Sequence, residues 1–166
     1  MADQNTATGG LAATELCVID FEVDGVFGIG ASPFGDTRIG YITGGSFRGP
    51  RLSGRVLPGG GNWSRGGRLG SDTSVGTFDA RAVLQTDDGA MLYLTYTGRT
   101  RTTEAVRARF AAADGGESVD PADYYLRIAV VFETAAPHYA WLNGILAVGM
   151  GAKTKRGVRH RMFEVL

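Results

Sequence analysis

Six polar side chains on predicted strands have the types that proton transfer and anion binding need. An arginine can hold a carboxylate, phenolate or enolate oxygen, and a nearby carboxylate can move a proton if burial raises its pKa. A tyrosine can donate a hydrogen bond to the same oxygen. The catalytic set that this combination predicts is Glu133, Arg127, Asp79 and Tyr96.

The predicted binding residues add flat apolar walls and neutral hydrogen-bonding groups to this set. Two tryptophans would supply the walls, and two asparagines would supply the neutral groups. The predicted substrate-binding set is Arg81, Asn62, Trp63, Tyr125, Trp141 and Asn143. Arg127 and Glu133 are the strongest candidates because each interrupts an otherwise apolar strand, where a charge needs a partner or a task.

A structural interpretation of the same residues stands beside the functional one. Arg81 with Asp79 or Glu133 would then form salt bridges on an exterior sheet face, and Tyr96 would only pack. Trp141 fits a plug at one end of a barrel as well as it fits a ligand contact.

The usual catalytic and metal-binding signatures are missing. Gly28-Ile29-Gly30 continues as neither a dinucleotide fingerprint nor a phosphate loop. His138 and His160 form no ligand-spaced cluster with Cys17 or a carboxylate. The sequence therefore predicts no metal and no cofactor.

Charge and composition exclude several classes of partner. Lysine plus arginine and aspartate plus glutamate number 17 each, which removes the electrostatic case for nucleic acid or an anionic membrane surface. No apolar run approaches the roughly 20 residues of a membrane span, and the N-terminus lacks the pattern of a signal peptide. A single cysteine permits no internal disulfide. The predicted compartment is the cytoplasm.

The elements that must position these residues are predicted to be strands. The stretch 41–63 has short β-capable runs cut by four glycines, which is typical of a strand that curls at a barrel corner. Strands are also expected at 15–23, 123–133, 142–148 and 158–165, with possible continuation of the first over 26–29. The stretch 62–76 has no periodicity and is predicted to be a surface loop, and 149–157 a basic turn.

One hairpin has a register that can be written down. Residues 77–86 and 90–98 flank Asp87-Asp88-Gly89, and a two-residue loop places Arg81 opposite Tyr96, on one face with Asp79. A three-residue loop would break this pairing. The stretch 102–113 is the one convincing helix, with a threonine cap, and could cover an opening.

Twenty-six glycines, about twice the usual share, and turn signals throughout favour an all-β architecture. We expect a single closed or nearly closed antiparallel barrel of about eight strands with one short helix. Residues 1–13 are predicted to be a flexible tail, and residues 14–166 the barrel domain.

Several motifs run in order along the chain, among them GGSFRGP at 44–50, GRVLPGGGNW at 54–63, YYLR at 124–127 and YAWLN at 139–143. Together they resemble the family called domain of unknown function 3237, small bacterial and fungal β-barrel proteins. The resemblance implies a barrel related to the calycin and allene-oxide-cyclase-like folds. The family pattern often has an acid where this chain has Asn62, and phenylalanine where it has Leu126.

Three hypotheses for function follow. The first is a cofactor-independent enzyme (an isomerase, a lyase or hydratase, or a cyclase) acting by proton transfer on an oxygenated, partly apolar metabolite in the barrel lumen. The second is a non-catalytic small-molecule carrier or sensor, and the third is a structural or assembly protein. A barrel with two partly apolar faces must cover one of them, so a homodimer is expected.

Overall fold

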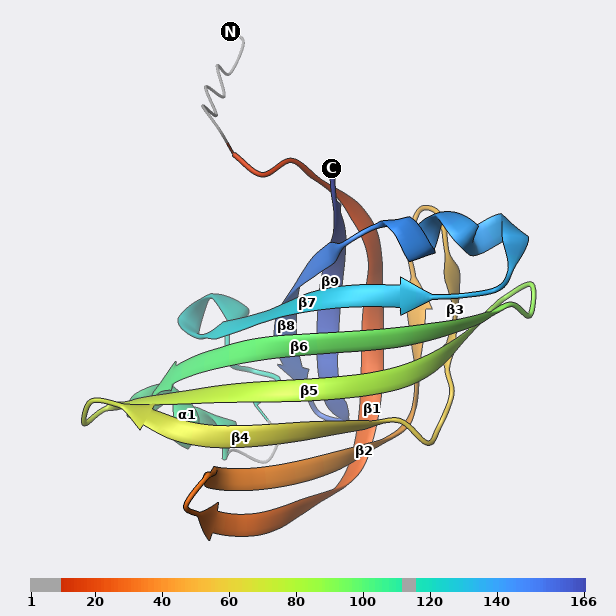
Figure 1. The fold of residues 1–166 in the computed structure, drawn as a ribbon. Coiled ribbons are helices and arrows are strands. Elements are labelled where there is room, and N and C mark those ends of the chain that lie inside the picture. Colours follow the sequence, from red (N-terminus) through yellow and green to blue (C-terminus); the bar gives the residue numbers. More distant parts are fainter. Residues whose placement is uncertain (1–9, 112–115) are drawn as a thin grey trace, which may run out of the picture.

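The protein folds as one closed antiparallel barrel, seen here in a computed structural model that describes residues 10–111 and 116–166 (Figure 1). The strands are β1 (Ala13–Ser32), β2 (Gly35–Arg48), β3 (Ser53–Val56), β4 (Gly61–Leu69), β5 (Thr73–Thr86), β6 (Met91–Thr103), β7 (Tyr125–Glu133), β8 (Ala147–Thr154) and β9 (Gly157–Val165). Eight of them form a ring in the order β1-β9-β8-β7-β6-β5-β4-β2, which closes through the β1–β2 pairing, while β3 lies between β2 and β5. The predicted eight-strand barrel is confirmed.

Three short helical segments accompany the strands. They are α1 (Glu104–Phe110), η1 (Pro121–Asp123) and η2 (Pro137–Gly144). The predicted helix is confirmed with shorter bounds, and Thr103 caps it by accepting a hydrogen bond from the Val106 amide at 3.3 Å. The segment 142–148 is η2 and the start of β8 rather than one strand, and the predicted basic turn at 149–157 shrinks to the end of β8 and the link to β9. The predicted tail 1–13 lies mostly outside the described residues, and Ala13 begins β1.

The curling of the strands depends on close backbone approaches, as the glycines at 44–54 predict. Gly45 has a φ of 138°, and a Cβ there would lie 1.9 Å from the Asp20 carbonyl oxygen of β1. Any other residue would push β1 and β2 apart at this point. Asp24-Gly25, which resembles a hairpin turn in the sequence, is instead a shift in register within the continuous β1.

The predicted register of the β5–β6 hairpin is wrong by one residue. The Thr86 amide donates to the Ala90 carbonyl at 2.9 Å, which closes a three-residue loop, and Gly89 takes the positive φ (88°) that such loops need in their last position. Arg81 therefore pairs with Thr95, and Tyr96 pairs with Ala80. The shift turns Tyr96 to the inside and leaves Asp79 and Arg81 outside.

Apolar side chains fill one half of the barrel. Alternate residues of β5, β6 and β7 point inward and are buried: Ala80, Ala82, Leu84, Leu92, Leu94, Ile128, Val130 and Phe132. Tyr139 and Leu142 of η2 pack against the same core. At the other ends of β5 and β6 the inward positions change to Ser74, Gly76, Thr100 and Thr102, and there the barrel is hollow.

Candidate functional site

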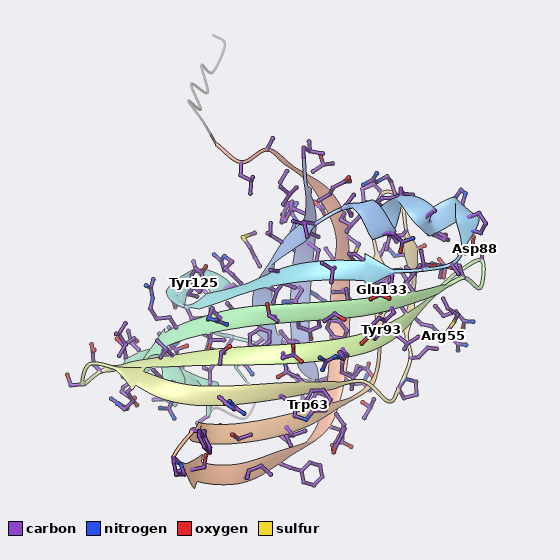
Figure 2. The ribbon with its side chains drawn as sticks, in the orientation of Figure 1. Arg55, Trp63, Asp88, Tyr93, Tyr125 and Glu133 are labelled. Atoms are coloured by element: carbon purple, nitrogen blue, oxygen red, sulfur yellow. The ribbon has the colours of Figure 1, made fainter. Side chains whose placement is uncertain are left out.

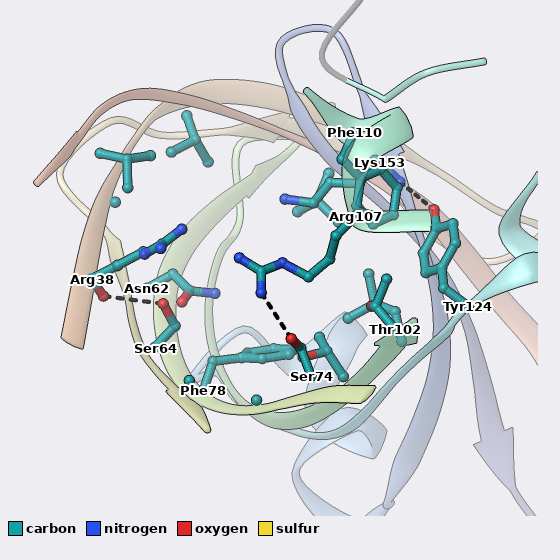
Figure 3. A pocket seen from close by; sticks show the side chains of 18 of the residues that line it. Arg38, Asn62, Ser64, Ser74, Phe78, Thr102, Arg107, Phe110, Tyr124 and Lys153 are labelled. Carbon is teal, nitrogen blue, oxygen red and sulfur yellow. Dashed lines mark hydrogen bonds between the residues drawn. The ribbon is translucent and has the colours of Figure 1, made fainter. Parts of the chain in front are cut away.

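A cavity of about 910 Å³ occupies the hollow half of the barrel (Figure 3). Its walls come from β1, β2, β4 to β9 and α1, so nearly the whole ring contributes. Figure 3 shows Arg38 and Asn62 on one side and Arg107, Phe110 and Lys153 on the other. This volume suits a small organic ligand.

His160 of β9 is the titratable group at the inner wall of this cavity. It is 1% exposed, and its Nδ1 is buried with no hydrogen-bond partner among the residues that the structure describes. Burial and, as the smaller cause, the nearby Lys153 charge together lower the pKa of the His160 imidazole to about 4. The imidazole is therefore neutral at pH 7. Its ring packs edge-on against Tyr96, with the ring centroids 5.5 Å apart.

Tyr96 and Asn62 form the second polar feature of the inner wall. Tyr96 is 2% exposed, and burial raises the pKa of its phenol, an effect that a hydrogen bond with the Asn62 side chain partly opposes. The phenol is therefore protonated at neutral pH. Asn62 is half-buried and lines the cavity, so Tyr96 lies behind it and holds its amide.

The outer part of the cavity is strongly basic. Seven basic side chains and one carboxylate, Asp36, contribute to its lining, although the whole chain has no net charge. The basic residues are Arg38, Arg65, Arg68, Arg107, Lys153, Lys155 and Arg156. Such a concave concentration of one sign of charge attracts ligands of the opposite sign.

Lys153 has no carboxylate partner among the described residues, and the same is true of Arg65 and Lys155. Arg38 pairs with Asp36 at 3.0 Å, Arg107 contacts Glu104 at 3.3 Å and Ser74 Oγ at 2.9 Å, and Arg156 pairs with Glu22. Lys153 is exposed by surface area, yet protein atoms surround its ammonium group where it lines the cavity. That partial desolvation, followed by the Arg38 charge, lowers the pKa of its ammonium group.

Most of the predicted catalytic residues lie outside the barrel rather than in its lumen. Asp79 and Arg81 form an exposed salt bridge of 2.8 Å, as the structural interpretation proposed for them. Arg127 is half-buried on the outer face, with its guanidinium 4.9 Å from the centre of the Tyr125 ring. Glu133 is exposed, so three residues of the predicted catalytic set and the predicted binding residue Arg81 lie outside the lumen. The reason is the alternation of the strands: inward positions of β5 and β7 are the apolar ones.

The predicted binding residues divide in the same way. Trp63 and Tyr125 are 42% and 41% exposed and project from the outer face, as Glu133 does (Figure 2). Trp141 packs partly against the core beneath the Arg51 guanidinium, 3.9 Å from the ring centre. The Asn143 side-chain amide accepts a hydrogen bond from the Thr134 backbone N–H at 2.8 Å and donates one to the Thr134 carbonyl at 2.9 Å. Of the ten predicted residues, only Asn62 lines the large cavity, and Tyr96 lies directly behind it.

Glu133 and Asn143 meet in a second, shallow hollow of about 480 Å³ on the outside of the barrel, with Tyr93 and Thr134. Glu133 is its one charged lining residue, and none of its described side chains has a buried polar atom without a partner, as His160 has in the barrel cavity. We therefore place the candidate site in the barrel cavity.

Sequence reasoning missed His160, Lys153, Arg38 and Arg107. The sequence did contain a signal for His160, because Val158, His160 and Met162 alternate on one face of the predicted last strand. Lys153 was assigned to a turn, although the structure continues β8 to Thr154. No sequence pattern indicated that Arg38 and Arg107 face a cavity, since Arg38 lies on a curled strand and Arg107 on a short helix.

The structure also bears on a cysteine nucleophile, on a metal site and on membrane-spanning helices. Burial raises the pKa of the Cys17 thiol to about 12, so this buried cysteine is not a nucleophile at neutral pH. Among residues 10–111 and 116–166, no group of three or more His, Cys, Asp and Glu side chains could hold a metal ion. The helices of the same residues are all too short to cross a membrane.

Relatives with solved structures share this barrel. A β-barrel-like protein from Acinetobacter baumannii is 31% identical and superposes with a TM-score of 0.78, covering 98% of this chain and 100% of that one. A conserved protein of unknown function from Rhodopseudomonas palustris is 28% identical, with a TM-score of 0.83 over 96% and 100% of the two chains. An enzyme from Penicillium herquei shares the fold at 19% identity, with a TM-score of 0.64 over 98% of this chain and 99% of that one.

Sequence comparisons agree with the structural ones. A UPF0311 protein of Rhodopseudomonas palustris is 35% identical over 120 residues, which are 72% of this chain and 73% of the relative. The model of the family described as protein of unknown function (DUF3237) matches residues 13–165, almost the whole barrel. The chain therefore belongs to the DUF3237 family.

Proposed function

We propose that the protein is a cofactor-independent enzyme that transfers a proton on a small, oxygenated, partly apolar molecule bound in the barrel cavity. The observation that carries this proposal is His160, a neutral, buried imidazole at the cavity wall whose Nδ1 has no described partner. Buried polar atoms are nearly always paired, so an unpaired one beside a cavity is explained by a ligand or water that completes it.

The residues of the inner wall have complementary roles in such a reaction. His160, unprotonated at pH 7, accepts a proton from the substrate and returns it. Asn62 offers its amide to the oxygen on which negative charge develops, and Tyr96 holds that amide in place. Isomerisation, elimination, hydration and cyclisation all fit this arrangement. The Penicillium herquei protein, described as an enzyme, supports the idea that a barrel of this shape can house catalysis.

A proton-transfer enzyme can be tested before its substrate is known. We would incubate the protein in D₂O with mixtures of small ketones, enols and unsaturated acids, and follow loss of C–H signals or new products by proton NMR. The wild type should exchange or convert at least one compound. His160→Gln should lower that rate by a factor on the order of 10²–10⁴, the usual contribution of a general acid or base.

The matched control is His138→Gln, since His138 is the other histidine, is exposed and lies on η2. It should keep the wild-type rate. Thermal unfolding of both variants would identify a loss of rate that comes from misfolding, and Asn62→Leu then provides a second test in the same wall. Binding without exchange or conversion would contradict catalysis and favour the carrier or sensor.

A further inference from the structure

The charges of the outer cavity carry an inference about the substrate class, which rests on the proposed use of the cavity as a substrate site. We infer that the substrate is an organic anion whose charged group lies between Arg38 and Lys153 and whose apolar part reaches toward His160. A carboxylate on a ring or short chain fits this description.

The first argument is the unequal pairing of charges. Four of the basic lining residues share three carboxylates: Arg38 with Asp36, Arg68 and Arg107 with Glu104, and Arg156 with Glu22. No described carboxylate pairs with the other three, Arg65, Lys153 and Lys155, and of these Lys153 lies on β8, the strand that pairs with the strand of His160. A partly desolvated ammonium group without a counter-ion is unfavourable, and a ligand anion would supply the missing charge.

The second argument is the placement of two like charges on different walls of the cavity. Arg38 comes from β2 and Lys153 from β8, on opposite sides of the cavity, and they are near enough for the arginine charge to act on the lysine (Figure 3). An anion between them relieves this repulsion and can accept hydrogen bonds from both. Two such donors on separate strands hold a carboxylate in one orientation.

The third argument is the apolar surface deeper in the cavity. Phe78 and Leu126 line it beside His160 and Asn62, while Val158 is level with Lys153 and Val23 with Arg156. A fully polar ion would leave this surface in contact with water. The lining therefore suits a ligand with a charged end and an apolar body.

Anion binding would also raise the pKa of His160, the proposed base. The Lys153 charge is one of the two causes that lower the pKa of His160. A bound anion beside Lys153 cancels part of that effect, so that the imidazole becomes more basic when the substrate is present. The substrate charge and the proton acceptor are in this way linked through one lysine.

The test uses two probes with the same ring and different charge, 1-naphthylacetate and 1-naphthylacetamide, in isothermal titration calorimetry at pH 7. For the wild type we expect the anion to bind at least about tenfold more tightly than the amide, with a preference that shrinks as salt screens the charges. Lys153→Met and Arg38→Met should each remove most of the preference while keeping the affinity for the amide. Lys153→Arg should keep the preference.

Arg81→Met is the matched control, because Arg81 is an arginine on the outer face and is also paired with an aspartate. It should bind both probes as the wild type does. Equal affinity of the wild type for the two probes, no binding of either, or an unchanged preference in Lys153→Met would each overturn the inference. Because the readout is binding alone, a protein that binds the anion but transfers no proton would contradict the proposed function and leave this inference standing.

Discussion

His160 gives the folding stability of the protein a pH dependence. Its folded-state pKa is about 4, against 6.5 for an unperturbed histidine. Between these values the unfolded chain binds a proton that the folded chain does not, so the free energy of unfolding rises with pH over this window and falls as the solution is acidified. The shift corresponds to a loss of about 3 kcal/mol by pH 4.

Carboxylates also titrate at low pH, so the prediction concerns a difference between proteins. Between pH 6.5 and pH 4 we expect the unfolding free energy of His160→Gln to fall less than that of the wild type. The difference should be most of the roughly 3 kcal/mol that the His160 pKa shift contributes. Urea unfolding at several pH values, followed by tryptophan fluorescence, measures it. Parallel curves for the two proteins would mean that the folded protein protonates His160 as readily as the unfolded chain does.

Residue types alone could not place the candidate site. Arg127 and Glu133 are polar residues in an apolar strand, but the inward face of β7 already consists of Leu126 and three further apolar residues. The charges occupy the alternate positions and therefore face outward. His160 occupies an inward position of β9, so that a face-by-face reading of the last strand would have found it.

At the scale of elements, hydrophobic alternation predicted the strands that build the core and failed for those that build the cavity. The stretch 62–76 has no hydrophobic periodicity and is predicted to be a loop, yet it contains most of β4 and the start of β5. Its inward positions include Asn62, Ser64 and Ser74, which line the cavity. A strand that faces a hollow, polar interior loses the apolar signal on which strand prediction depends.

Helix α1 carries two cavity-lining residues, Arg107 and Phe110, and its placement depends on its first turn. Thr103→Ala removes the hydroxyl that caps the Val106 amide, which should cost about 1 kcal/mol of unfolding free energy and speed amide exchange in residues 104–110. Hydrogen–deuterium exchange with mass spectrometry measures both the site and the size of the change.

Thr103→Ser is the control, because serine keeps the capping oxygen and loses only a methyl group. It should exchange as the wild type does. If the alanine variant leaves exchange in residues 104–110 unchanged, the cap is not what holds the helix at the opening.

At the scale of the whole molecule, the barrel separates an inner surface with a cavity from an outer surface with exposed aromatic residues. Phe27 is 56% exposed, Tyr41 49% and Trp63 42%. Ile39 pairs with both Phe27 and Trp63 across the sheet, and the Phe27 and Tyr41 rings lie 5.7 Å apart. These four residues form an outer aromatic patch on β1, β2 and β4.

The outer aromatic patch is where we expect the predicted homodimer to form. A two-fold interface brings the same surface together from both subunits, so it must be complementary to itself. The patch meets this condition, because its centre is uncharged and the Asp79–Arg81 salt bridge beside it offers one charge of each sign.

Tyr41→Arg should therefore convert a dimer to a monomer in sedimentation equilibrium, since it places two like charges together in an apolar contact. Tyr125→Arg, a similarly exposed tyrosine on β7, should remain a dimer. A wild-type protein that is monomeric at about 100 μM, well above the dissociation constants of stable homodimers, would contradict the expectation.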